Sequence, residues 1–148
     1  MNHECYMRLA LSLADEAGEC GEVPVGCVIT DADGRVIGRG RNRREECHDA
    51  TAHAEIEAIR EACRTRGNWR LDDCTLYVTL EPCPMCTGAI INARISCVVF
   101  GAREENSGAC GSVLDLFSEN FRHHPKVFPG ICADDCRCLL SRFFQSQR

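Results

Sequence analysis

The sequence is poor in lysine and has no long apolar run. Lys126 is its one lysine, so nearly all of its 17 basic side chains are arginines. No apolar stretch approaches the roughly 20 residues that cross a bilayer, which argues against a membrane protein. Residues 1–5 have neither a basic segment nor an apolar one, so we expect no secretory signal and a cytoplasmic location. No linker or internal repeat is visible, and one domain over residues 1–148 is predicted.

The acidic charge balance excludes a protein that coats nucleic acid generally. The formal net charge is −5. Arginines are nevertheless concentrated locally, because five fall within residues 35–44 and no acidic residue follows Asp135. A solvated face would explain these clusters, and so would a surface that grips phosphates with bidentate arginines. Composition leaves both interpretations open.

The cysteines do not resemble a disulfide framework. There are 13, an odd number, and several fall in segments that are otherwise apolar. Buried free thiols behave as small hydrophobic side chains, so we predict reduced cysteines in a reducing compartment. Cys132, Cys136 and Cys138 could in principle bind a metal, but their spacing matches no common zinc pattern.

Two short motifs contain the residues with the clearest chemistry. The first is His53-Ala54-Glu55, and the second is Pro82-Cys83-Pro84-Met85-Cys86. His53, Cys83 and Cys86 are three zinc-type ligands, one fewer than a closed structural site uses, so a fourth position stays open for water. This pattern is typical of zinc nucleobase deaminases, in which the glutamate moves protons and does not bind the metal. We therefore predict one Zn²⁺ per chain and Glu55 as the catalytic residue.

The spacing of these motifs indicates helix ends. Residues two apart point to different sides of a regular helix, so His53 and Glu55 can share a metal only where the chain enters one. Cys83 and Cys86 share a face, and Pro84 suits a first helical turn. The zinc is therefore expected between two helix N-termini, whose dipoles favour thiolates. Taken alone, the cysteine pair could be redox-active, or part of a structural zinc site.

Hydrophobic patterns predict an α/β protein. Helices are expected at 6–17, 53–65, 83–93 and 131–144, with a short helical piece at 113–117. Strands are expected at 23–30, 35–40, 74–80, 95–101 and 127–129, with a turn at 31–34 and the second strand at the sheet edge. The strand–helix–strand order around the cysteine pair indicates a parallel crossover. The prediction is a three-layer α/β/α fold with a mixed sheet of about five strands.

The chain resembles the bacterial tRNA-specific adenosine deaminases over nearly its whole length. The matching segments are residues 22–26, 42–43, 48–56, 75–89, 98–103, 108–112 and 139–144. This resemblance implies the cytidine-deaminase-like fold, zinc, a homodimer, and conversion of adenosine to inosine at the wobble position of a tRNA anticodon stem-loop. The zinc motifs by themselves are shared with cytidine, cytosine and guanine deaminases, so they indicate the chemistry but not the substrate.

The resemblance also suggests which residues bind substrate. Asn42 is assigned to the purine edge, although a turn asparagine would explain it too. The loop with Arg103 and Glu104 would help hold the nucleotide. At the position of Glu104 the family more often has aspartate. Arg142, Phe143 and Phe144 are candidates for contacts with RNA outside the pocket. Ordinary helix packing is the alternative for the two phenylalanines, and we expect it to hold for one of them.

Two other functions compete with tRNA deamination. One is a free-base or nucleoside deaminase, such as a guanine deaminase. The other is a catalytically inactive RNA-binding or structural zinc protein. A structural zinc site does not need a glutamate at position 55, so Glu55 argues against this alternative. The arginine-rich chain end favours RNA over a free base, but only weakly.

Overall fold

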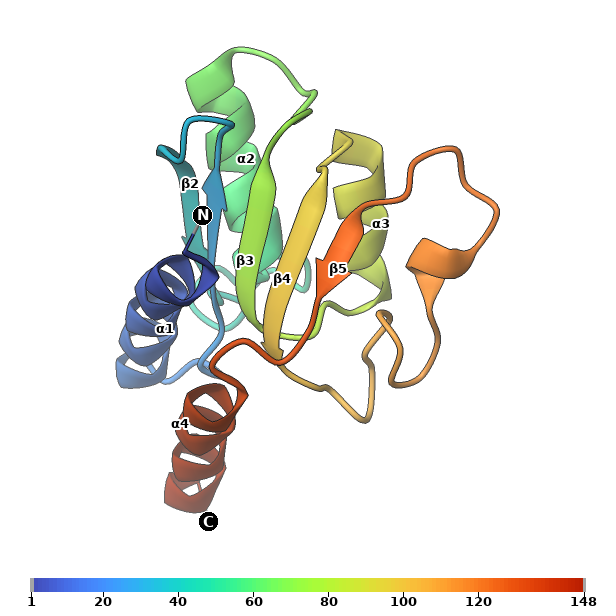
Figure 1. Cartoon of the computed structure of the whole chain (residues 1–148). Helices are drawn as coiled ribbons and strands as arrows, with labels where there is room; N and C mark the ends of the chain where they lie inside the picture. Colours follow the sequence, from blue (N-terminus) through green and yellow to red (C-terminus); the bar gives the residue numbers. More distant parts are fainter. Residues whose placement is uncertain (1, 148) are drawn as a thin grey trace.

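The computed structural model describes residues 2–147 and confirms a mixed five-stranded sheet with helices on both faces (Figure 1). The strand order is β2-β1-β3-β4-β5. The helices are α1 (His3–Glu19), α2 (Ala54–Arg66), α3 (Pro84–Ala93) and α4 (Ala133–Ser146), with a short 3₁₀ turn, η1 (Leu116–Ser118). The strands are β1 (Gly26–Thr30), β2 (Val36–Arg41), β3 (Thr75–Leu80), β4 (Cys97–Ala102) and β5 (Lys126–Phe128).

The sheet is mixed because two kinds of connection build it. A tight turn joins β1 to the antiparallel β2, and the Asp31 carboxylate holds this turn by accepting hydrogen bonds from the N–H groups of Asp33 and Arg35, each at 2.9 Å. Helix α3 joins β3 to the parallel β4. β2 lies at an edge of the sheet, as the sequence predicted, and β3 lies at its centre.

Alternation along the central strands divides the core between the two faces. Leu76 and Val78 point to the side covered by α2 and α3, whereas Tyr77 between them points to the side of α1 and α4. Side chains of successive strand residues point to opposite faces, so a strand buried on both sides is apolar throughout. This explains why Leu76, Tyr77 and Val78 form an uninterrupted apolar run in the middle of β3, between the buried Thr75 and Thr79.

Helix α2 lies unusually close to β2 because the strand has glycines where the helix crosses it. A Cβ added at Gly40 would lie 2.2 Å from the carbonyl oxygen of Ala54, and one at Gly38 would lie 2.3 Å from that of Ala58. No side chain fits in those gaps. The two glycines therefore fix how deeply the first turns of α2 settle onto the sheet.

Three predicted elements begin three residues from where the structure places them. The helix predicted at 6–17 is α1, which begins at His3 because the Asn2 side chain caps it by accepting the Cys5 N–H. The strand predicted at 23–30 begins only at Gly26, since Pro24 has no N–H to donate to a neighbouring strand. The Asn42 N–H donates to the Val25 carbonyl at 3.0 Å, which extends the β1–β2 pairing by one hydrogen bond beyond the strand ends. The predicted helical piece at 113–117 is η1, which begins only at Leu116 because residues 111–114 form a turn closed by an antiparallel bridge between Cys110 and Asp115.

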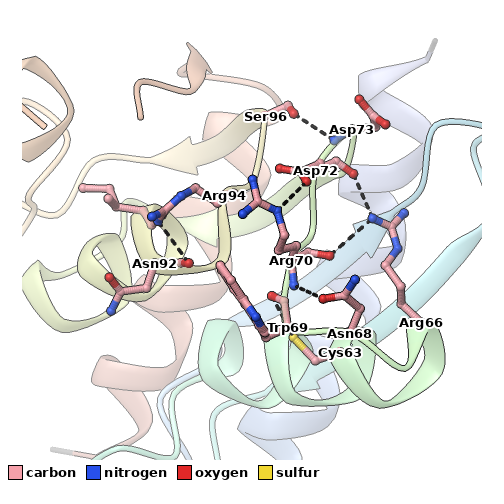
Figure 2. Close-up of polar contacts among 11 residues, drawn as sticks. Cys63, Arg66, Asn68, Trp69, Arg70, Asp72, Asp73, Asn92, Arg94 and Ser96 are labelled. Carbon is pink, nitrogen blue, oxygen red and sulfur yellow. Dashed lines mark hydrogen bonds and ion pairs between the residues drawn. The ribbon is translucent and has the colours of Figure 1, made fainter. Parts of the chain in front are cut away.

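A polar cluster ties together the C-terminal ends of α2 and α3 (Figure 2). The guanidinium groups of Arg70 and Arg94 lie 5.2 and 5.9 Å from the ring centroid of Trp69. Arg66 donates to the Asp72 carbonyl at 2.8 Å, and Arg70 pairs with the Asp72 carboxylate at 3.0 Å. These contacts hold the two helices in fixed relation at the ends opposite their N-caps.

The cysteines are free thiols throughout residues 2–147, as predicted. Cys27 and Cys74 are buried, and Cys63 and Cys97 are half-buried against the core. No helix in this part of the chain combines the length and apolarity needed to cross a membrane.

Candidate metal centre and pocket

The two helix N-termini bring the three predicted metal ligands together. His53 is the N-cap of α2, Cys83 is the N-cap of α3, and Cys86 lies in the first turn of α3. Pro84 occupies the start of α3, where its missing N–H costs no hydrogen bond. The His53 side chain makes no capping hydrogen bond to its own helix, and the Cys83 sulfur faces His53 and Cys86. Both are therefore available to a ligand.

The donor geometry of this group fits zinc. Nδ1 of His53 lies 3.6 Å from Sγ of Cys83 and 3.5 Å from Sγ of Cys86. Zinc bonds of about 2.3 Å to sulfur and 2.0–2.1 Å to nitrogen, at tetrahedral angles, place such donors roughly 3.6 Å apart. Among residues 2–147 this is the one group of at least three His, Cys, Asp or Glu side chains close enough to hold a metal, so Cys132, Cys136 and Cys138 form no second site.

The two cysteines are electrostatically unequal without a metal. Hydrogen bonds from Cys86 and His53 stabilise the Cys83 thiolate and lower the pKa of Cys83 to about 4. The neighbouring Cys83 sulfur and burial raise the pKa of Cys86. The pair therefore keeps one proton, which a metal that binds both sulfurs must displace.

Glu55 lies beside this group, in the first turn of α2, and also lines the cavity. Its side chain is buried, with 4% of the residue exposed. Burial raises the pKa of Glu55 to about 7, because a carboxylate loses its hydration there. A carboxyl group poised in this way suits proton transfer in both directions near neutral pH.

A cavity of about 220 Å³ opens in front of these groups. Its walls come from five parts of the chain: the approach to β1, the loop and helix entry before and in α2, the segment between β3 and α3, the loop after β4, and α4. The lining residues are Val23, Val25, Asn42, Arg44, His53, Ala54, Glu55, Leu80, Glu81, Cys83, Glu104, Ser107 and Phe144.

Asn42 lies in the cavity wall and is firmly held. Its side-chain nitrogen donates to the Val23 carbonyl at 3.2 Å, and its side-chain oxygen accepts the Arg44 N–H at 3.2 Å. The residue is 9% exposed. The amide thus has a fixed orientation, and one hydrogen on its nitrogen and one lone pair on its oxygen stay free for another partner.

The two predicted residues after β4 are placed differently. Glu104 lines the cavity. Arg103 does not, since its guanidinium lies 5.2 Å from the ring of Phe100 and donates to the Cys110 carbonyl at 3.4 Å. Arg103 therefore braces the loop from behind, while Glu104 faces the pocket.

The three residues of α4 that were predicted to contact RNA lie in two different places. Phe144 lines the cavity and is 52% exposed. Arg142 and Phe143 line another hollow, which they share with Asp15 and Pro24. Phe143 meets Phe144 edge-on, with ring centroids 5.5 Å apart. Phe144 is thus the aromatic side chain of α4 at the mouth of the pocket.

Several lining residues carried no recognisable signal in the sequence. Arg44 and Ser107 lie in polar loops whose conformations follow from tertiary contacts. Two buried glutamates, Glu22 and Glu81, hold these loops by hydrogen bonds to backbone N–H groups. Both adjoin motifs that were noticed, the segment 22–26 and the Pro82–Cys86 run. Glutamate directly beside an apolar strand was the available clue.

Fold and donor set together define a zinc-binding deaminase. The family model of the cytidine and deoxycytidylate deaminase zinc-binding region matches residues 1–102. The tRNA-specific adenosine deaminase of Bacillus subtilis is 44% identical over 98% of this chain and 90% of its own length. The chain belongs to this deaminase family, within the group of tRNA-specific adenosine deaminases.

Solved structures agree with this placement. A tRNA:A34 deaminase, from a study of A-to-I editing at the wobble position of transfer RNA, is 47% identical, with a TM-score of 0.87 over 91% of this chain and 98% of that one. A guanine deaminase of Bacillus subtilis is 36% identical, with a TM-score of 0.66 over 82% of this chain and 88% of that one. The tRNA deaminase is the more similar of the two in both sequence and fold.

Proposed function

We propose that this protein is a zinc-dependent hydrolase that converts adenosine to inosine at the wobble position of a tRNA anticodon. The observation that carries the proposal is the placement of the His53, Cys83 and Cys86 donors and the Glu55 carboxyl at one cavity. The similarity to tRNA:A34 deaminases supports the choice of substrate. One domain, residues 1–148, carries the whole activity.

His53, Cys83 and Cys86 hold the zinc in this proposal, with one ion per chain. When bound, zinc supplies a water molecule whose pKa is lowered toward 7 and hence a nucleophile at neutral pH. Glu55 takes a proton from the water and delivers it to purine N1. After oxygen has added to C6, Glu55 takes the proton of the new C6 hydroxyl and passes it to the leaving amine, and the C6–N bond breaks to release ammonia. Adenosine and water thus give inosine and ammonia.

The pocket walls supply the substrate contacts. The fixed amide of Asn42 can both donate to and accept from the purine edge, and Glu104 lies on the wall formed by loop 103–112. Phe144 offers a ring at the mouth on which a splayed-out anticodon base can stack. Arg142 and Phe143, outside the cavity, are proposed to contact flanking RNA, and Arg103 to brace the loop.

A substrate panel tests this function. A stem-loop with adenosine at the wobble position should be deaminated far faster than free adenosine, guanine or cytidine. Activity on the stem-loop should fall as salt rises, because arginine–phosphate contacts are salt-dependent. Rapid turnover of guanine with no reaction on the stem-loop would replace this proposal by the free-base alternative, to which the guanine deaminase similarity gives some support.

The Phe144→Ala variant tests the aromatic contact. Loss of one stacked base costs about 1–3 kcal/mol, which corresponds to roughly a 5- to 150-fold fall in kcat/KM on the stem-loop. Zinc content and the slow reaction with free adenosine should not change. Phe121→Ala is a matched control, since Phe121 is similarly exposed, at 45%, but does not line the cavity. Equal activity of the two variants would remove Phe144 from the substrate site.

We also propose a homodimer in the cytoplasm. Val113 and Leu114 are 56% and 42% exposed and are separated only by Asp115 from η1, which packs against α3. Covering such side chains by a second copy would stabilise a dimer. Leu114→Asp should then shift the molar mass measured by light scattering from dimer to monomer. The free thiols support the location, since they persist in a reducing compartment.

A further inference from the structure

Two glutamates are almost completely buried and have no part in the proposed chemistry. Glu22 is 1% exposed and Glu81 is 2% exposed. A buried carboxylate is costly unless hydrogen bonds replace its hydration. Each of these two obtains its hydrogen bonds from one loop in the wall of the cavity.

Glu81 directly follows β3 and gathers four donors from the loop after β4. Its Oε1 accepts from the Glu104 N–H at 3.1 Å and from the Ser112 hydroxyl at 2.5 Å. Its Oε2 accepts from the N–H groups of Cys110 at 3.0 Å and Ser112 at 3.1 Å. One carboxylate thus organises loop 103–112, in which Glu104 and Ser107 line the cavity.

The same loop closes tightly around the carboxylate. A Cβ at Gly108 would lie 2.5 Å from the Glu81 carboxyl carbon and 2.5 Å from the Glu104 carbonyl oxygen. The Ala109 N–H donates to the Pro82 carbonyl at 2.8 Å, immediately before Cys83. The Glu81 side chain has no exposed surface. It can therefore act on a substrate only through the loop.

Glu22 holds a second wall in the same way. Its two carboxylate oxygens accept from the N–H groups of Glu45 at 3.0 Å and Glu46 at 2.8 Å. These residues belong to loop 42–50, in which Asn42 and Arg44 line the cavity. The Glu22 N–H donates to the Ala17 carbonyl near the end of α1, so its backbone is anchored too.

We infer that Glu22 and Glu81 are positioning residues that hold loops 42–50 and 103–112 in the shape that receives the nucleotide. The inference rests on the proposed function for the identity of the substrate. The two carboxylates carry negative charge, and negative charge near a polyanion such as RNA disfavours its binding. Their benefit must therefore come from the loop geometry that they impose.

Glu22→Gln and Glu81→Gln test the inference with little change in side-chain shape. Glutamine has one acceptor oxygen, so its amide nitrogen faces backbone N–H groups that lose their partner. We expect KM for the stem-loop to rise more than kcat falls, with kcat/KM reduced roughly 10- to 100-fold. Zinc should remain at one ion per chain.

Matched controls separate geometry from charge. Glu45→Gln and Glu105→Gln remove the same charge from the same two loops, and both side chains are exposed without hydrogen bonds or ion pairs to residues 2–147. Loss of charge alone strengthens RNA binding or leaves it unchanged. The buried variants are expected to weaken it. Opposite effects on RNA binding from a buried glutamate and an exposed glutamate of the loop that it holds would be hard to obtain from a general loss of stability.

Amide hydrogen exchange gives a readout that needs no substrate. In Glu81→Gln the amides of Glu104, Cys110 and Ser112 should exchange faster, while those of Glu45 and Glu46 stay protected. Glu22→Gln should show the reverse. If a glutamine variant does not fold, Ser112→Ala and Glu22→Asp serve instead, with a several-fold effect on KM expected from each.

The outcomes are distinguishable. Glutamine variants that match their controls in KM, or that lose thermal stability while KM stays the same, overturn the positioning role. An unchanged exchange rate at the bonded amides overturns it as well. A wild-type enzyme that does not act on the stem-loop refutes the proposed function, whereas hydrogen exchange still decides what the two carboxylates hold.

Discussion

Gly40→Ala is expected to distort the metal centre, because Gly40 on β2 lies against the first turn of α2. The new Cβ would lie 2.2 Å from the carbonyl oxygen of Ala54 and 2.7 Å from the nitrogen of Ala58. Ordinary carbon–oxygen contacts are above 3 Å, so α2 must move away from β2 by roughly 1 Å, and overpacking of this kind costs about 1–3 kcal/mol. Ala54 is the residue between His53 and Glu55. The shift therefore displaces both functional side chains.

Two measurements check this reasoning. The stability loss corresponds to a fall in melting temperature of roughly 2–12 °C for a domain of this size. A displacement of about 1 Å at the catalytic groups lowers kcat by up to about 100-fold. The loss of kcat should appear at a temperature where the variant is fully folded and loaded with zinc.

Gly38→Ala is the control for Gly40→Ala. It creates a similar clash, 2.3 Å from the Ala58 carbonyl, but one turn further along α2 from His53. It should destabilise the protein to a similar extent with a smaller effect on kcat. A Gly40→Ala enzyme with wild-type stability and activity would show that α2 is not held by this contact.

Three further predictions concern the chemistry of the site and the thiols. Glu55→Ala should fold and keep its zinc but lose about 10²- to 10⁴-fold in kcat, roughly 3–5 kcal/mol of barrier; near-normal turnover would exclude Glu55 from proton transfer. Removing zinc with a chelator should abolish activity and lower the melting temperature, because the ion links α2 to α3, and adding zinc back should restore both; activity that survives in metal-free protein would contradict the proposed site. In the native protein a disulfide reagent should react quickly at the four exposed cysteines only. The buried thiols outside the metal group should react only after unfolding; burial raises the pKa of one of them, Cys136, to about 12. Fast reaction of more than four thiols would argue against the packing described. The exposed cysteines are Cys5, Cys20, Cys47 and Cys138, and the buried ones are Cys27, Cys74, Cys110 and Cys136.

Motifs and hydrophobic patterns were enough to predict the zinc site and the arrangement of helices and strands. The motif spacing of His53, Cys83 and Cys86 is a local property, since N-cap and first-turn positions follow from Pro84 and from the helical runs behind them. Strands β3 and β4 could also be recognised in the sequence, because strands buried on both faces are rich in apolar residues. That is why the sequence predicts the mixed sheet, its edge strand β2 and the ligand group, all of which the structure contains.

The walls of the pocket were decided only by the tertiary structure. The conformation of loops 42–50 and 103–112 depends on carboxylates located 23 to 31 residues away in the chain, and no local pattern records such hydrogen bonds. The same holds for α4, where Phe143 and Phe144 are neighbours in sequence but only Phe144 lines the cavity. Adjacent helical residues point about 100° apart, and which one faces the pocket is set by how α4 packs against α1 and β4.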